Sequence, residues 1–158
     1  MRSLAFAIAW ALVIAGLAAL LAHWRGEALS GRSAAVVAVF AAGSFLGAWC
    51  AWGAASLVTL RRRKARGPAR FAAMVLFLSL GTAAFAALFF FLQLRAYYSE
   101  WHTQKISYRM LWEQVFTAAT TTYIFGVMGA RALLPFALVP LLAFSLYFAR
   151  IEPRRRVC

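Results

Sequence analysis

Acidic residues are almost missing from this chain of 158 residues. There is no aspartate, and the four acids are all glutamates, at positions 27, 100, 113 and 152. This excludes mechanisms that need an aspartate pair, an aspartyl nucleophile or an aspartate-bound magnesium ion. Because lysine and arginine together number 17, the formal net charge is +13.

Cysteine and histidine are nearly as scarce. The two cysteines, Cys50 and Cys158, form no CxxC motif and no Cys/His cluster, so neither a structural zinc site nor a redox motif is expected. A buried haem would need two histidines facing each other inside the membrane. His23 and His102 are not placed in this way. We therefore predict no cofactor and no metal.

Charge of either sign is also rare relative to apolar residues. Hydrophobic residues make up 65% of the chain and charged residues 13%, whereas soluble domains average about 45–50% and about 25%. This composition argues against a soluble enzyme. It predicts an all-α integral membrane protein in which residues 1–158 form a single membrane domain.

The positive charge lies in short runs between apolar segments, a pattern typical of cytoplasmic membrane loops. Nucleic acid is the usual partner of so basic a chain. Here no soluble domain is expected to present the charge, so no nucleic-acid partner is predicted.

Three uncharged apolar runs predict membrane-spanning helices at about 4–23, 33–60 and 71–94, each close to or above the roughly 20 residues that span hydrocarbon. The first run is too long for the apolar region of a cleaved signal peptide. It also has Leu20, Leu21 and Ala22 where a small-x-small cleavage site would stand, so we interpret it as an uncleaved anchor.

The last apolar stretch, 111–149, would be about 60 Å long as one helix at about 1.5 Å per residue, twice the hydrocarbon thickness. Arg131, Pro135 and Pro140 interrupt it. We divide it into a segment at 111–130, interfacial or spanning, and a helix at 132–149. The fold class is therefore a small bundle of four membrane-crossing helices, with five as the alternative.

Charge bias favours four crossings with the N-terminus in the cytoplasm. The basic loop 61–70 is then cytoplasmic, and the aromatic-rich loop 95–109 lies at the outer interface. Five crossings would divide the cations almost evenly between the two sides. The Ala/Arg-rich, Lys-poor composition favours a GC-rich bacterial genome, and hence a bacterial cytoplasmic (inner) membrane.

The second run carries small residues at every fourth position: Gly43, Gly47, Ala51 and Ala55. The ridge begins with a GxxxG motif, which lets helix backbones approach closely in lipid. We expect it to pack the first and second helices together. The alternative is a face that grips another protein or a second copy of the chain.

A polar stripe follows one face of the segment 111–130, with Glu113, Thr117 and Thr121 at successive i, i+4 positions. One interpretation is an outward-opening pocket for a lipid headgroup, a quinone or another substrate. The other is that the hydroxyls bond to carbonyls of their own helix. The candidate pocket residues are His23, Gln93, His102, Glu113, Gln114, Thr117 and Thr121.

Two basic clusters are expected to face the anionic cytoplasmic leaflet, where each cation contributes on the order of 1 kcal/mol. They either anchor the topology or bind acidic lipid specifically. The candidate contacts are Arg61, Arg62, Arg63, Lys64, Arg66, Arg70, Arg154, Arg155 and Arg156.

Small size, helix-packing faces and the lack of catalytic groups favour a non-enzymatic accessory, assembly or stabilising subunit of a larger membrane complex. Its expected partners are membrane lipids, anionic lipids among them, and another membrane protein or a second copy of itself. One alternative is a small oligomeric transporter or channel for uncharged or lipid-like cargo. A second is a membrane enzyme acting on lipid or quinone at the outer face.

Overall fold

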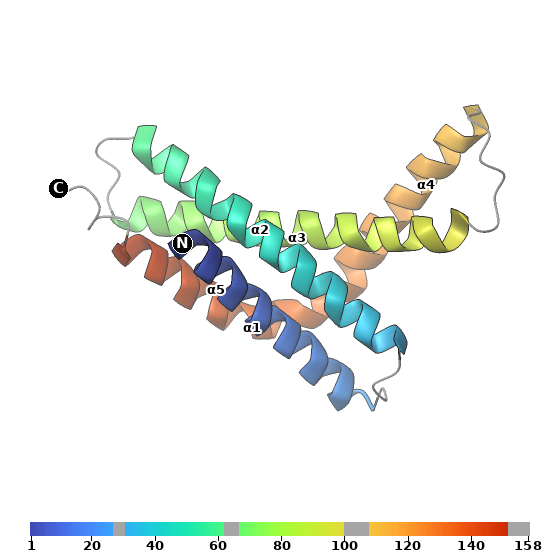
Figure 1. The fold of residues 1–158 in the computed structure, drawn as a ribbon, viewed down its shortest axis with the longest axis horizontal. Coiled ribbons are helices and arrows are strands. Elements are labelled where there is room, and N and C mark those ends of the chain that lie inside the picture. The colour runs from blue at the N-terminus through green and yellow to red at the C-terminus, as the bar shows by residue number, and fades with distance from the viewer. Residues whose placement is uncertain (27–30, 62–66, 100–107, 152–158) are drawn as a thin grey trace.

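The computed structural model describes residues 1–26, 31–61, 67–99 and 108–151, and all regular structure in these ranges is helical. The predicted all-α class is thereby confirmed. Figure 1 shows the elements, which follow the chain as α1 (Arg2–Trp24), α2 (Gly31–Arg61), α3 (Gly67–Ser99), α4 (Tyr108–Ile124), the π-helical segment η1 (Phe125–Ala130) and α5 (Arg131–Ile151).

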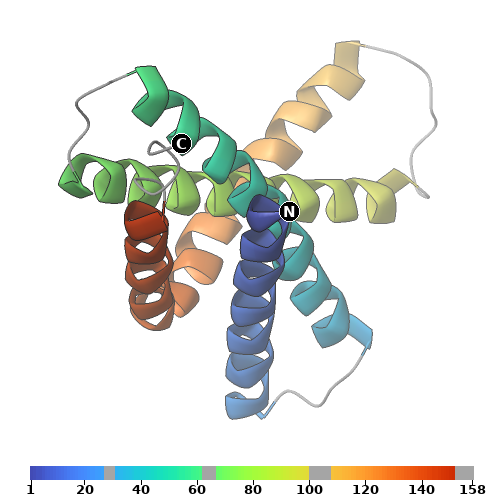
Figure 2. The ribbon, with the colours of Figure 1, turned by 60° about the vertical axis from the view of Figure 1, so that its left-hand side comes forward.

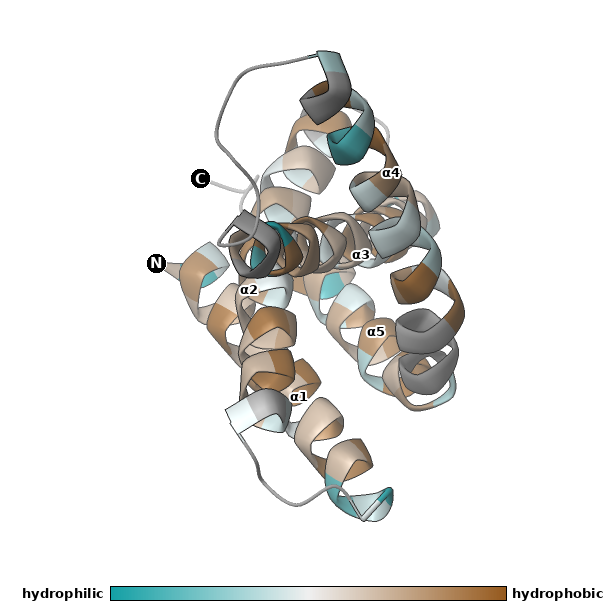
Figure 3. Cartoon of the chain, turned by 90° about the vertical axis from the view of Figure 1, so that its right-hand side faces the viewer, coloured by the Kyte–Doolittle hydropathy of each residue, from teal (hydrophilic) through white to brown (hydrophobic). Residues whose placement is uncertain are grey.

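Three helices are long and apolar enough to cross a membrane: Arg2–Trp24, Ser33–Thr59 and Gly67–Ala96. They coincide with the three uncharged runs of the sequence. A shorter apolar stretch, Pro135–Ile151, lies in α5. Figure 3 shows more hydrophilic colour on α4 than on α1. The helices also expose large apolar side chains such as Leu12 and Leu57, at 68% and 63%, and large exposed apolar surfaces commonly mark sites of contact with lipid or protein.

α1 ends at a glycine in the left-handed conformation. Gly26 has a φ of +71°, a region that side chains disfavour and that commonly stops helices. The backbone N–H groups of Arg25 and Gly26 donate to the carbonyls of Leu21 and His23, at 3.1 and 3.0 Å. These bonds satisfy carbonyls that the end of the helix would otherwise leave free.

An aromatic cluster joins three helices at one end of the molecule. The ring centroid of Phe6 in α1 lies 5.0 Å from that of Trp52 in α2 and 5.2 Å from that of Phe144 in α5. The ring centroid of Trp52 lies 4.9 Å from that of Phe148 in α5. The beginning of α1 therefore meets the end of α5, and the two helices run antiparallel (Figure 1).

The last apolar stretch is interrupted differently from what the sequence predicted. Arg131 begins α5, and Pro135 and Pro140 lie inside that helix. The interruption is instead the π-helical segment Phe125–Ala130, whose wider turn changes the path of the backbone. There α4 turns away from α5, and it projects from the bundle in two views (Figures 1 and 2).

Candidate functional site

α2 and α3 cross in direct backbone contact at the GxxxG motif. A Cβ atom added at Gly43 would lie 2.6 Å from the N and Cα atoms of Ala86. One added at Gly47 would lie 2.6 Å from the carbonyl carbon of Gly81 and the nitrogen of Thr82. Real Cβ atoms do not come so close to a backbone, so only glycine permits this crossing.

The glycines of the ridge thus face α3, whereas the sequence analysis expected the first helix. The reason is geometric, because positions four residues apart drift by about 40° around a helix of 3.6 residues per turn. Ala51 and Ala55, at the end of the ridge, belong to the buried cluster that contains Phe6 and Trp10 of α1. With Gly43 and Gly47 buried inside the fold, the GxxxG motif is not free to grip a partner.

A hydrogen bond ties α1 to the same crossing. The indole Nε1–H of Trp10 donates to Oγ1 of Thr82 at 3.0 Å, and Trp10 is buried. A hydrogen bond of this kind contributes on the order of 1 kcal/mol to stability. Sequence reasoning missed this pair, although a tryptophan in mid-span signals that its N–H needs an acceptor.

The hydroxyls of the polar stripe are used within α4 itself. Thr117 donates to the carbonyl of Glu113 at 2.7 Å, and Thr121 donates to the carbonyl of Thr117 at 2.6 Å. Thr122 does the same with Ala118 at 2.8 Å. This geometry matches the self-bonded interpretation of the stripe, and Thr121 is buried.

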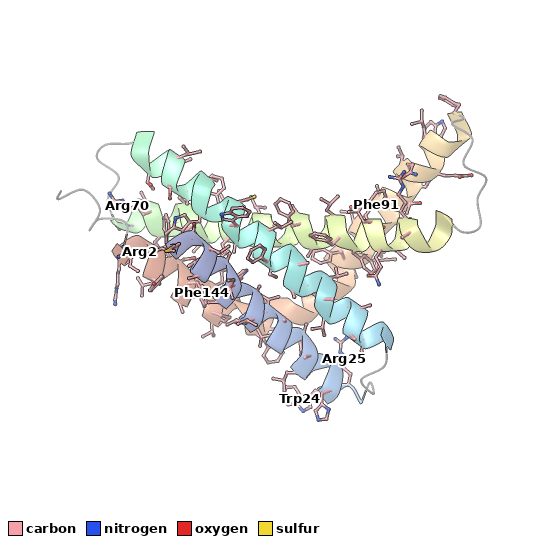
Figure 4. All side chains as sticks on the ribbon, in the orientation of Figure 1. Arg2, Trp24, Arg25, Arg70, Phe91 and Phe144 are labelled. Carbon is pink, nitrogen blue, oxygen red and sulfur yellow. The ribbon has the colours of Figure 1, made fainter. Side chains whose placement is uncertain are left out.

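The other candidate pocket residues that the structure describes lie on three different helices, α1, α3 and α4. His23 is exposed in the last turn of α1, at the end of the helix where Figure 4 labels Trp24 and Arg25. Gln93 and Glu113, both exposed, lie on α3 and α4, which diverge toward their connecting segment (Figures 1 and 2). Gln114 is half-buried on α4, and His102 lies outside the described residues.

The face of α4 opposite Thr121 carries an aromatic row that we call the α4 aromatic row: Tyr108, Trp112 and Phe116. Successive ring centroids lie 6.4 and 6.1 Å apart. The three side chains are exposed by 74%, 51% and 65%. The sequence shows their i, i+4 spacing, but it predicts Tyr108 in the loop 95–109, whereas the structure begins α4 at this residue.

Three arginines, Arg2, Arg70 and Arg150, lie at one end of the bundle, which we call the basic end. Figure 4 shows Arg2 and Arg70 at this end and Arg25 at the other, and Arg150 lies in the last turn of α5 beside the start of α3. Arg70 is only 7% exposed. Of the other candidate lipid contacts, Arg61 has no described side chain, and the following lie outside the described residues: Arg62, Arg63, Lys64, Arg66, Arg154, Arg155 and Arg156.

Comparison of the chain with protein-family models, with curated proteins and with solved structures finds no match. Among the residues that the structure describes, no group of three or more His, Cys, Asp or Glu side chains is placed to hold a metal ion. The function must therefore be argued from the surfaces themselves.

Proposed function

We propose that this protein is a non-enzymatic subunit of a larger membrane complex, and that it docks on its partner through α4. The observation that carries the proposal is the α4 aromatic row, exposed on a helix that projects from the bundle. The opposite face of α4 is occupied, because Thr121 is buried and α4 packs on α3. The row is thus the side of α4 that remains for a partner.

Aromatic side chains suit such a role. Tyrosine, tryptophan and phenylalanine are enriched at protein interfaces, where they give large rigid contact areas. The 17 residues of α4 form a helix of about 25 Å at about 1.5 Å per residue. A helix of this length lies well in a groove of another protein and presents anchors one turn apart.

In the membrane, α1, α2, α3 and α5 make four crossings, and α4 lies at the outer boundary. The aromatic cluster supports this arrangement, because it brings the beginning of α1 and the end of α5 to one end. The positive-inside rule supports a cytoplasmic location for that end, where Arg2, Arg70 and Arg150 lie. The exposed Tyr108 and Trp112 fit an outer interface, where such rings gather.

The test compares two tryptophans of equal exposure. Trp112 in α4 is 51% exposed and Trp49 in α2 is 50% exposed. The tagged chain is purified gently from its own membranes and examined by native mass spectrometry. We expect a partner at fixed stoichiometry, lost in Trp112→Ala and kept in Trp49→Ala.

Two outcomes contradict the proposal. One is a partner that Trp112→Ala and Trp49→Ala retain equally, because docking would then not use α4. The other is a homo-oligomer with bound small molecules and no heterologous subunit, which is the behaviour of the transporter alternative. Helical content and thermal melting of both variants establish that each is folded.

A further inference from the structure

A groove opens at the basic end of the bundle, where α3 begins beside the end of α5. It is lined by Gly67, Pro68 and Phe71 of α3 and by Leu146, Ala149 and Arg150 of α5. Its volume is about 390 Å³, within the range of about 300–1,000 Å³ that is usual for small-molecule sites. Leu146 is 44% exposed, so the groove is open on a side that faces lipid when the bundle lies in a membrane.

The lining is apolar except for one cation. Arg150 is exposed at the edge of the groove, opposite the first turn of α3. The backbone N–H groups of a first helical turn have no partner within the helix, and they favour anions. An occupant that fits this lining therefore combines an apolar body with an anionic head.

Arg70 is a second cation near the groove, although it is not among the residues that line it. It lies in the first turns of α3 and is only 7% exposed, and its Nε atom has no hydrogen-bond partner. A buried guanidinium N–H without an acceptor is unfavourable. Phosphate oxygens are acceptors that suit a guanidinium group well.

We infer that this groove binds one anionic glycerophospholipid. An acyl chain lies along Phe71 and Leu146, and the phosphate lies between Arg150 and the first turn of α3. A free phosphate ion would leave the apolar lining unfilled, whereas an acyl chain occupies it, so the lipid is the better occupant. The site differs from a general attraction of basic loops to the leaflet, because it depends on Arg150 and on the shape of the groove.

The lipid site is separate from the α4 docking surface and holds whether or not a partner exists. The two proposals fail separately, because Trp112→Ala is expected to bind lipid as the unchanged protein does. Only changes at the groove are expected to weaken lipid binding.

The experiment titrates the purified full chain, in a neutral detergent, with phosphatidylglycerol or with phosphatidylcholine of the same acyl chains. Native mass spectrometry counts the bound lipids. We expect one phosphatidylglycerol to bind well below the concentration that phosphatidylcholine needs. Arg150→Gln should weaken its binding about fivefold, the factor expected for one cation at an anionic surface.

Matched variants separate the groove from general charge and from general damage. Arg25→Gln removes the same charge at the opposite end. Gly67→Leu fills the groove, and Gly53→Leu adds the same side chain on α2; neither glycine has an atom within 4 Å of its added Cβ. We expect Arg150→Gln and Gly67→Leu to weaken binding, and Arg25→Gln and Gly53→Leu to leave it unchanged.

Three results would overturn the inference. Equal binding of the two lipids would show that the anionic head is not recognised. Equal losses in Arg150→Gln and Arg25→Gln, or an unaffected Gly67→Leu, would show that the groove is not the site. Displacement of the lipid by soluble glycerol phosphate would identify a free phosphate compound as the ligand and remove the role of the acyl chain.

Discussion

Adding one methyl group at Gly47 should force α2 and α3 apart. The new Cβ atom would lie 2.6 Å from the carbonyl carbon of Gly81 and from the nitrogen of Thr82, whereas ordinary contacts begin at 3.4 Å. Both of these neighbours are backbone atoms, so no side chain can rotate away. The helices must separate by about 0.8 Å, and such overpacking costs about 1–3 kcal/mol.

The assay is unfolding of the purified protein in mixed micelles by added sodium dodecyl sulfate, followed by circular dichroism. Gly53→Ala is the matched control, because it makes the same change in α2 where no atom lies within 4 Å. We expect Gly47→Ala to lose about 1–3 kcal/mol of unfolding free energy and Gly53→Ala to lose none. Equal stability of the two variants would refute the close crossing.

Three further predictions concern other parts of the chain. Thr82→Val should cost about 1 kcal/mol in the unchanged protein and less in a Trp10→Phe background, where the hydrogen bond is already lost. Thr117→Val should change the unfolding free energy by less than about 0.5 kcal/mol, because the hydroxyl bonds only to its own helix. In intact cells that express the Cys50→Ser variant, a membrane-impermeant thiol reagent should not label Cys158, because four crossings place the C-terminus in the cytoplasm. Ready labelling of Cys158 would contradict the four-crossing topology.

The helices were predictable because their signal is local. Uncharged runs of sufficient length are the property that a membrane requires, and those at 4–23, 33–60 and 71–94 lie within α1, α2 and α3 with only small shifts at their ends. The glycine ridge was likewise legible. Its partner was not, because whether Gly47 meets α1 or α3 depends on how three helices pack around Trp10 and Thr82.

The site was less predictable than the fold, since its features depend on tertiary placement. The groove joins Phe71 and Leu146, which are far apart in the sequence. In α4 the threonines drew attention because polar residues are rare in apolar segments, yet they bond to their own backbone. The exposure of Trp112 and Phe116 depends on how α4 lies against the other helices, and no residue pattern predicts this arrangement.

The central claim, that α4 docks on a partner, is tested most directly by site-specific photocrosslinking in intact cells. A photoreactive residue replaces Phe116 on α4 or, as the control, Leu12 on α1; these side chains are exposed by 65% and 68%. The proposed function predicts one discrete protein adduct from position 116 and none from position 12. An absence of adduct at 116, or the same adduct from both positions, would contradict it.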